Sequence, residues 1–588
     1  SAFLFRAAAY RQHRYVYCGV LLMSWIFGFY SKKPIDTKFV SELHPPAIES
    51  VINNRYNIAI GGNKTTLVSE KNNPQMKYFV CGIPISQDSS KILDKGDLNN
   101  IFESPLHNFD IISGHYCGVL IQNDSICFFT DKLGLREIHI YENENGWYFS
   151  TRLDWLLKLN HFEIDFNEFG SRWKLINQLS NKSIVKKIHR INCGSKAKIE
   201  QNRIEFTECN WLPQKDRAVS RSEFDNTLRK NVLIGTYHNS KISLSLSGGM
   251  DSRVVLSYLL SSDYNNWDCH TFKSESNMDS TIAENISKHF HIKYQILSDN
   301  NFNHDNMLPD LCEYVGATYL TESGYISRKL MHYESLPQDN LIIDGGFGEI
   351  WRREFLTRLY HFGKKDLLDR NTQNISRYLT NHRADIFNED CDSIMQNGIN
   401  EQIDKIFSDL PPVKEIGLGN WLDLFSLKTR LVNYYAPEQA RIDNYVKAYM
   451  PFVQLSLLEN LLNVPIDIRK NNRLFKSIIK SNYYKLSKYP LAKGNLSYPY
   501  WFTPLMKRAY SKVYNASNQS GENHNKDIYL NKLKEFTLDT ISSNAVKEYP
   551  PYNYAIIKKN ISDYYKGNVE LRKFVDWFIT FEIFKQKL

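Results

Sequence analysis

The stretch SLSLSGGMDSR, residues 243–253, decides the fold of this chain. Residues 242–246 read as a strand, and an apolar run that begins near Ser252 reads as a helix. A parallel strand that runs into a glycine turn and then a helix N-terminus forms an anion site, because the glycines let the backbone approach the anion. The N–H groups of the turn and the helix dipole then point at it. The hydroxyls of Ser247 and Ser252 can donate to phosphate oxygens.

An aspartate follows the glycines of this turn. Asp251 is negatively charged like a phosphate group, so a carboxylate beside such an anion indicates a bridging Mg²⁺. The stretch lacks the spacing and the Lys-Ser/Thr pair of a Walker loop, so transfer of a γ-phosphoryl group is not implied. The plain alternative is a Ser/Gly turn that caps a helix, with Asp251 in the first turn because of the dipole.

Strands and helices alternate on both sides of this turn. Residues 224–236 have helical periodicity, 267–272 and 293–297 read as strands, and 280–289 read as a helix. Such alternation predicts parallel βαβ units. From about Ile350 onward the pattern is mainly helical.

The first two hundred residues predict a β-rich part instead. Short runs of β-branched and aromatic residues, separated by Gly, Asn and Asp, indicate strands at 56–60, 78–85, 116–122, 126–130 and 138–141. A last strand pair is expected over 188–211. Residues 212–220 are polar and contain Pro213, so we place the boundary between two domains there, giving 1–215 and 216–588.

Bulk properties agree with a globular protein of more than one domain. The chain has 588 residues, of which 42% are hydrophobic and 23% charged, and its formal net charge is +9. This mild basic bias is compatible with anionic ligands but too weak to indicate nucleic acid. The nine cysteines form no CxxC pair, so we expect reduced, mostly buried thiols in a cytoplasmic protein.

An apolar run at 16–30 follows three arginines and has the order of a targeting segment. It is short for a membrane span. We favour a buried strand and keep a targeting role as the alternative.

The turn at 247–252 matches the SGGxDS pyrophosphate loop of ATP pyrophosphatases, and the chain around it resembles the asparagine synthetase family. Three stretches of the first part support that branch in the expected order: DKLGLR at 131–136, FSTRLDWLL at 149–157, and IHRINCG at 188–194. Thr271-Phe272, followed by Asp279, is similar to the strand and helix after the loop. The likeness covers most of residues 16–500.

The resemblance implies an α/β protein, with an N-terminal degenerate Ntn-type β-sandwich (αββα) domain followed by a parallel-sheet α/β ATP-pyrophosphatase domain with a helical C-terminal part. It implies that ATP is split to AMP and pyrophosphate, with Mg²⁺, while a carboxylate is activated as an acyl-adenylate for attack by an amine. The residues expected to bind ATP and pyrophosphate are Leu246, Ser247, Gly248, Gly249, Asp251, Ser252, Phe272 and Gly345.

Two further stretches complete the expected site. LIIDGGFGEIW at 341–351 reads as a buried strand that breaks into a glycine loop, and it resembles the family's S-G-E-G-x-D-E loop with an offset of one residue. Asp344 and Glu349 therefore both remain candidate magnesium ligands beside Asp251, and a plain turn with a solvated Glu349 is the alternative. PLAKGN at 490–495 resembles a loop whose lysine, here Lys493, stabilises the transition state. An exposed surface lysine is the alternative there. Lys493, Asp251 and Glu349 are the expected catalytic residues.

The N-terminal part has an incomplete glutaminase pattern. Cys18-Gly19-Val20 resembles the family's Cys-Gly-Ile start, in which a freed N-terminal cysteine attacks glutamine. The Arg-Gly-Pro-Asp loop and the Asn-Gly-Glu-Ile strand of that site are missing. We therefore expect a non-catalytic scaffold, as in the β-lactam synthetase and lasso-peptide cyclase branches, and keep glutamine hydrolysis after exposure of Cys18 as the alternative.

The expected partners follow from these residues. Lys447, Tyr449 and Gln454 replace the Glu, Arg and Asp of the family pattern, which speaks against free aspartate as substrate. We expect a small-molecule or peptide carboxylate and an amine or ammonia donor, without nucleic acid or membrane, and leave a homodimer open. Rival hypotheses are a nucleotide- or tRNA-modifying ligase, for which the catalytic Cys pair and basic face are missing, and a non-catalytic ATP-binding partner protein.

Overall fold

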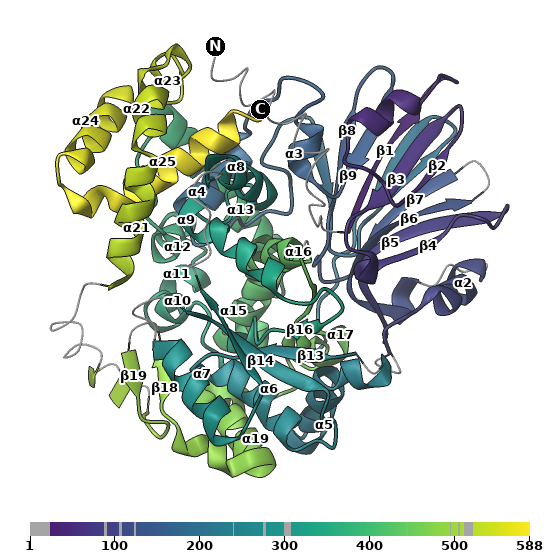
Figure 1. Ribbon diagram of the computed structural model, residues 1–588. Helices are drawn as coiled ribbons and strands as arrows, with labels where there is room; N and C mark the ends of the chain where they lie inside the picture. Colours follow the sequence, from purple (N-terminus) through teal and green to yellow (C-terminus); the bar gives the residue numbers. More distant parts are fainter. Residues whose placement is uncertain are drawn as a thin grey trace.

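The computed structural model describes residues 24–588, apart from 88–90, 105–108, 123–124, 239, 274–277, 299–306, 444, 494–495, 504–505, 508 and 511–520. Two antiparallel sheets of six strands form the N-terminal part (Figure 1), and a parallel sheet of five strands lies at the centre of the second part. The C-terminal helices pack at the side of both. The mixed α/β fold class expected from the sequence is confirmed.

The first antiparallel sheet has the order β10-β8-β9-β1-β3-β2. Its strands are β1 (Trp25–Ser31), β2 (Glu49–Ile52), β3 (Tyr56–Gly61), β8 (Ile138–Glu142), β9 (Gly146–Ser150) and β10 (Ile188–Ile191). All residues of β1 are buried between β3 and β9. The expected strand is thus confirmed for residues 25–30 of the apolar run, while residues 16–23 lie outside the described part.

The second antiparallel sheet has the order β12-β11-β7-β6-β5-β4. Its strands are β4 (Leu67–Glu70), β5 (Met76–Ser86), β6 (Ile112–Gln122), β7 (Ser125–Thr130), β11 (Lys196–Glu200) and β12 (Arg203–Thr207). The expected strand pair over 188–211 is wrong in one respect, since three strands occur there and they belong to both sheets. Cys193 and Gly194, both with positive φ, turn the chain from β10 in one sheet to β11 in the other.

Period-two alternation explains why the two sheets stack. In β1, Ile26 and Tyr30 face the second sheet, whereas Trp25, Phe27 and Phe29 face helices on the outer side. The outer face of the second sheet is covered by α2 (Lys95–Glu103), which contributes Leu98 and Phe102. The layers therefore run helix, sheet, sheet, helix, as the αββα sandwich requires.

The parallel sheet has the order β15-β14-β13-β16-β17. Its strands are β13 (Ile242–Ser245), β14 (Trp267–Lys273), β15 (Tyr294–Ser298), β16 (Leu341–Ile343) and β17 (Lys447–Tyr449). Leu341 and Ile343 face one apolar cluster, and Ile342 between them faces another, so helices cover both sides. The chain extends the sheet first on one side of β13 and then on the other, which places a topological switch point between β13 and β16.

Helices make up most of the remainder, as expected beyond Ile350. Those before β17 are α3 (Leu153–Leu156), α4 (Phe166–Lys174), α5 (Arg221–Val232), α6 (Met250–Leu260), α7 (Met278–His289), α8 (Met307–Thr318), α9 (Gly324–Ser327), α10 (Thr357–Phe362), α11 (Lys364–Leu368), α12 (Thr372–Leu379), α13 (Glu389–Asp409), α14 (Val413–Ile416), α15 (Leu418–Ser426) and α16 (Ala436–Ile442). A π-helical segment, Leu427–Tyr435, joins α15 to α16. Short π-helices often mark functional sites.

The last part of the chain adds α17 (Leu455–Leu458), α18 (Ile466–Arg469), α19 (Arg473–Tyr483), α21 (Gly521–Lys532), α22 (Lys534–Ser542), α23 (Asn544–Lys547), α24 (Tyr554–Tyr565) and α25 (Arg572–Lys585), with the hairpin β18 (Leu491–Lys493) and β19 (Leu496–Tyr498). Helix α25 packs in one apolar cluster with β1, α4, α8 and α13. The C-terminal end of the chain therefore covers the N-terminal sandwich.

Helices α4 and α13 cross closely because a glycine stands on each. A Cβ on Gly398 would lie 2.2 Å from the carbonyl oxygen of Asn167, and a Cβ on Gly170 would lie 2.6 Å from that of Met395. We expect Gly398→Ala to lower the free energy of unfolding by about 1–3 kcal/mol, since backbone atoms must move apart. Thermal unfolding measures this change.

Gly96→Ala in α2 is the matched control, because its Cβ would meet only an Asp94 oxygen at 3.4 Å. That substitution should be neutral or stabilising by up to ~1 kcal/mol through helix propensity. Equal melting temperatures for the two variants would contradict the close crossing.

Candidate functional site

The glycine turn lies at the carboxyl end of β13, and α6 begins directly behind it with Gly249 as the N-cap. Ser243 and Leu244 pair with Ile342 and Ile343 of β16, so the loops that follow the two strands leave the sheet side by side. Ligands of open parallel sheets bind at such a switch point, outside the carboxyl ends of the strands. The expected strand, turn and helix are all present.

Hydrogen bonds within the turn fix its shape. Ser247 N–H donates to Ser252 Oγ at 3.1 Å, and the two hydroxyl oxygens are 3.0 Å apart. Gly249 N–H donates to Ser247 Oγ at 3.1 Å, and Gly248 N–H donates to Asp279 Oδ1 at 2.9 Å. The serines expected to meet phosphate thus bond each other here, and Asp279 holds the loop from α7.

The second glycine loop touches the first. A Cβ on Gly345 would lie 2.9 Å from the backbone nitrogen of Ser252, and a Cβ on Gly348 would lie 2.4 Å from Asp251 Oδ1. Glycine is required at both positions because no side chain fits between the loops. The structure therefore brings Asp251, Ser252 and Gly345 together, as the resemblance implies.

Asp251 has an arginine partner that the sequence did not suggest. Arg352 Nε donates to Asp251 Oδ1 at 2.8 Å, and Arg352 Nη2 donates to Oδ2 at 2.6 Å. Both side chains are largely buried. Against the effect of burial, the carboxylates of Asp251 and Glu354 raise the pKa of Arg352 above its ordinary value, so the guanidinium stays charged. Such bidentate, charge-assisted pairs are strong and geometrically specific.

The loop is also held from the side of β18. Arg253, which is fully buried, donates to the carbonyl oxygens of Tyr489 at 2.9 Å and Pro490 at 2.7 Å, and also to that of Gly248. Ala492 N–H donates to the same Gly248 oxygen at 3.0 Å. The backbone of Lys493, the next residue, is thus held close to the loop. Its side chain lies outside the described part of the structure.

Other expected residues fall at the same end of the sheet. Leu246 is buried, and its N–H donates to the carbonyl oxygen of His270 in β14 at 2.8 Å. Phe272 near the end of β14 packs against the ring of Tyr333 at 5.2 Å between centroids. The backbone of Leu246 is thus tied to β14, and the Phe272 ring lies against Tyr333.

A group of carboxylates lies across the loop from α6. Burial raises the pKa of Asp344, and neighbouring Glu349 adds to the rise. Burial also raises the pKa of Glu438 on α16 to about 7, with Glu322 and Asp344 adding to it and Arg441 opposing it. Neighbouring carboxylates that raise the pKa of Asp344 and of Glu438 make this a place where a cation would be favoured.

The π-helical segment faces this group with aromatic and basic side chains. Tyr435 hydroxyl donates to Glu349 Oε2 at 3.4 Å, and the Arg430 guanidinium lies 5.1 Å from the Tyr434 ring centre. The Nε and Nη1 atoms of Arg441, a buried residue, have no hydrogen-bond partner in the structure. These two donors are therefore available to an acceptor that enters beside α16.

These acids bear on the metal that the resemblance implies. Mg²⁺ is usually bound through one or two carboxylates together with substrate phosphates, and Asp344 and Glu349 fit that role. Asp251 does not fit it in this arrangement, because Arg352 occupies both of its oxygens. Among the residues that the structure describes, no group of three or more His, Cys, Asp or Glu side chains is arranged to hold a metal ion.

Two of the residues that depart from the pattern of the resembled family, Tyr449 and Gln454, contact the N-terminal part of the chain. Gln454 Nε2 lies 2.8 Å from Nε2 of His115 in β6, and the ring of Tyr449 stacks on His115 at 5.5 Å. Burial lowers the pKa of Lys447 at the start of β17. Whether Tyr449 and Gln454 also select a substrate stays a prediction.

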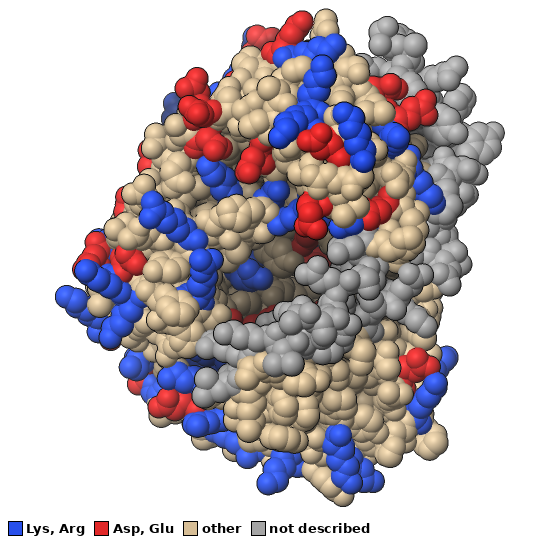
Figure 2. All heavy atoms as spheres, turned by 90° about the vertical axis from the view of Figure 1, so that its left-hand side faces the viewer, with Lys and Arg blue, Asp and Glu red and all other residues tan. Residues whose placement is uncertain are grey.

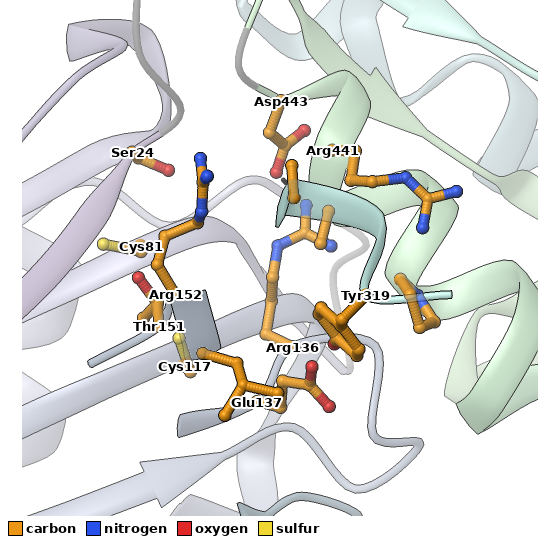
Figure 3. Close-up of a pocket in the computed structure, with 14 residues that line it drawn as sticks. Ser24, Cys81, Cys117, Arg136, Glu137, Thr151, Arg152, Tyr319, Arg441 and Asp443 are labelled. Atoms are coloured by element: carbon orange, nitrogen blue, oxygen red, sulfur yellow. Dashed lines mark hydrogen bonds and ion pairs between the residues drawn. The ribbon is translucent and has the colours of Figure 1, made fainter. Parts of the chain in front are cut away.

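A small cavity lies between the N-terminal part of the chain and α16. It measures about 30 Å³ and is lined by Ser24, Cys81, Cys117, Arg136 and Arg152 among others. Figure 3 shows the guanidinium group of Arg136 near the middle, with the cysteines on one side and Arg441 and Tyr319 on the other. This volume holds about one or two water molecules.

Neither thiol of this cavity is activated. Cys81 and Cys117 stand opposite each other on β5 and β6. Burial raises the pKa of the Cys117 thiol to about 12 and that of Cys81 well above its ordinary value. Ser24 is the described residue in front of β1, and Cys18 lies outside the described part. The described cavity thus contains no reactive thiolate.

Arg352, Arg253 and Glu354 are the site residues that sequence reasoning missed. The run WRRE at 351–354 directly after the glycine loop was the available signal. Adjacent parallel strands place the loops at their carboxyl ends side by side. An arginine after the second loop can therefore be expected to pair with the aspartate of the first.

The surface near these elements is hollowed. Figure 2 shows a hollow between the C-terminal helices and the α/β part, with basic and acidic side chains along it. In the described part of the chain, no helix combines the length and apolar character needed to cross a membrane.

The raised pKa of Glu438 predicts how stability depends on pH. Between about pH 4.5 and 7 the folded state holds a proton that the unfolded state has lost, so the free energy of unfolding falls as pH rises. Glu438→Gln removes this titration. From pH 5 to pH 8 its melting temperature should rise relative to wild type by about 1–3 °C, for a difference of ~1–2 kcal/mol. Parallel melting curves would contradict the raised pKa.

No family model matches the chain, and no curated protein matches it. Among solved structures, the chain is similar to the allosteric regulatory enzyme of purine biosynthesis, with 10% identity, a TM-score of 0.20 and coverage of 58% of this chain and 72% of that one. It is also similar to glutamine phosphoribosylpyrophosphate amidotransferase from B. subtilis, with 11% identity, a TM-score of 0.20 and coverage of 60% and 75%. Likeness at this level does not define an activity.

Proposed function

We propose that this chain is an ATP-dependent ligase that splits ATP to AMP and pyrophosphate, activates a carboxylate as an acyl-adenylate and passes the acyl group to an amine. The observation that carries the proposal is the contact of the two glycine loops, at 247–252 and 344–349, at the switch point of the parallel sheet. One loop has the features of a phosphate site, and the other brings carboxylates beside it.

The first loop is suited to hold the departing pyrophosphate. Gly249 is the N-cap of helix α6, and the dipole and first N–H groups of a helix favour an anion at this end. Arg253 and Asp279 hold the loop in shape from two sides, so little reorganisation is needed when phosphate arrives. No lysine of the Walker type is present, in keeping with attack at the α-phosphorus.

Asp344, Glu349 and Lys493 would act on the charges of the triphosphate that the first loop does not contact. Mg²⁺ would be held by Asp344 and Glu349 together with phosphate oxygens, and when bound it neutralises charge that builds on the leaving group. Lys493 is proposed to neutralise charge on the α-phosphate. The docking of Ala492 on Gly248 supports this, since it sets the lysine one residue from the loop.

Side chains of α16 and the π-helical segment would contact the acyl substrate and the amine. Tyr435, Glu349 and Glu438 supply acceptors for a cationic amine, and Arg430 and Arg441 supply donors for a carboxylate. Positioning the two reactants in one dry pocket provides much of the rate of such a reaction. The substrate is proposed to be a small molecule or peptide, since Lys447 and Tyr449 replace the family's Glu and Arg.

The N-terminal sandwich is proposed to act as a scaffold. Its described cavity has space for about one or two water molecules, and the thiols that line it are protonated. An amine that enters the second part directly would then replace ammonia from glutamine. Hydrolysis of glutamine by an exposed Cys18 is the competing proposal for this domain.

One observation favours a second candidate, a nucleotide-binding partner protein without ligase chemistry. Arg352 occupies both oxygens of Asp251, the residue that the resemblance assigns to magnesium. A chain that had exchanged its metal ligand for an ion pair could keep ATP binding and lose the reaction. Binding of ATP without exchange of pyrophosphate would identify this candidate.

Exchange of labelled pyrophosphate into ATP tests the ligase proposal. We expect wild type to catalyse exchange with at least one member of a carboxylate panel that includes peptides and sugar acids. Asp251→Ala should reduce exchange at least 100-fold, because it removes the charged centre between the two loops.

Asp263→Ala is the matched control, since this exposed aspartate follows α6 and should leave exchange unchanged. Absence of exchange with every carboxylate, in a protein that binds ATP, would reject the ligase and favour the second candidate.

A further inference from the structure

The guanidinium group of Arg352 is almost fully committed within the protein. An arginine has five N–H donors. Two meet Asp251 in the bidentate pair, and Nη1 lies 2.7 Å from Glu354 Oε2 and 3.4 Å from Asn472 Oδ1. One Nη2–H therefore remains beyond these four contacts. Arg352 can bridge Asp251 to one further acceptor without giving up a partner.

The backbone around Arg352 is built to hold it in this place. Phe347, Arg353 and Leu356 adopt left-handed φ angles of 64°, 54° and 52°, although none of them is a glycine. Three such residues within ten positions are strained, and strain of this kind concentrates at functional sites. Gly348 leaves the space that the Asp251 carboxylate needs. The geometry is thus specific to the pair rather than a chance surface contact.

Binding of a metal ion to Asp251 would be opposed by the guanidinium group of Arg352. Both carboxylate oxygens accept from a cation at 2.6 and 2.8 Å, and a divalent ion on the same oxygens would be repelled by the guanidinium. Asp344 and Glu349 have no such arginine in bidentate contact among the described residues. The positive charge beside Asp251 is therefore a fixed part of the chain.

We infer that Arg352 is the cation that serves Asp251, in the place where a magnesium ion would otherwise be ligated, and that its free Nη2–H is the donor offered to the pyrophosphate group. Arg352 is then a positioning residue for Asp251 and a phosphate contact of the loop. The inference rests on the proposed function, because it takes pyrophosphate as the ligand.

Calorimetric titration with inorganic pyrophosphate in the presence of EDTA tests the phosphate contact. Wild type should bind without free Mg²⁺, and Arg352→Gln should bind at least 10-fold more weakly. Arg352→Lys keeps the charge without the bidentate fork and should lie between the two. Arg473→Gln removes a nearby exposed charge that does not contact Asp251, and it should match wild type.

Titration with Mn²⁺, followed by electron paramagnetic resonance without nucleotide, tests the second half of the inference. Wild type and Asp251→Asn should bind Mn²⁺ alike. Arg352→Gln should gain a site, because it exposes the carboxylate to a metal, and Arg352→Gln/Asp251→Asn should lose that site again. A gained site cannot arise from a variant that merely fails to fold.

Two outcomes would overturn the inference while leaving the ligase proposal intact. One is equal pyrophosphate binding by wild type and Arg352→Gln, and the other is a Mn²⁺ site in wild type that Asp251→Asn abolishes. Failure of wild type to bind pyrophosphate or ATP under any condition would instead reject the proposed function, and this inference with it.

Discussion

The close approach of two glycine loops is the constraint on which the site depends. Strands β13 and β16 are hydrogen-bonded neighbours, so their following loops leave the sheet about 5 Å apart. Gly345 and Gly348 let the second loop lie against the backbone and carboxylate of Asp251. Because the two loops are in contact, Arg352, which follows the second loop, lies beside Asp251 of the first loop and pairs with it.

The N-terminal sandwich contributes to this site through one contact with the second part of the chain. Buried Arg136 pairs with Asp443, which follows α16, and Asp443 Oδ1 accepts from Ala448 N–H of β17 at 3.3 Å. The sandwich thereby fixes the turn between α16, which carries Glu438 and Arg441, and the strand next to β16. This contact would be kept if the sandwich acts as the proposed scaffold, because removal of one partner from a buried ion pair leaves an uncompensated charge.

The sequence was most informative where one local signal was enough. The turn at 247–252 predicted strand, turn and helix correctly, and alternation predicted the parallel units. The strands at 188–211 were misjudged because hairpins also contain left-handed turns like the one at Cys193 and Gly194. The sequence of this turn therefore does not tell whether the next strand stays in the same sheet or enters the other one. Arg352 was missed because its partner Asp251 lies 101 positions away, and local sequence patterns do not predict contacts over that distance.

The charges around Asp251 connect the arginine with the metal that the resemblance implies. Glu349 and Glu354 also act on this aspartate, and Lys507 lies within electrostatic reach of Glu354 and Arg352. Three carboxylates thus face two cations, so an incoming triphosphate would still meet excess negative charge. A divalent ion carried by the nucleotide and received by Asp344 and Glu349 would offset that excess. On the proposed function, Arg352 at Asp251 and a metal ion at Asp344 and Glu349 would be complementary, since Arg352 forms its bidentate pair with Asp251 alone.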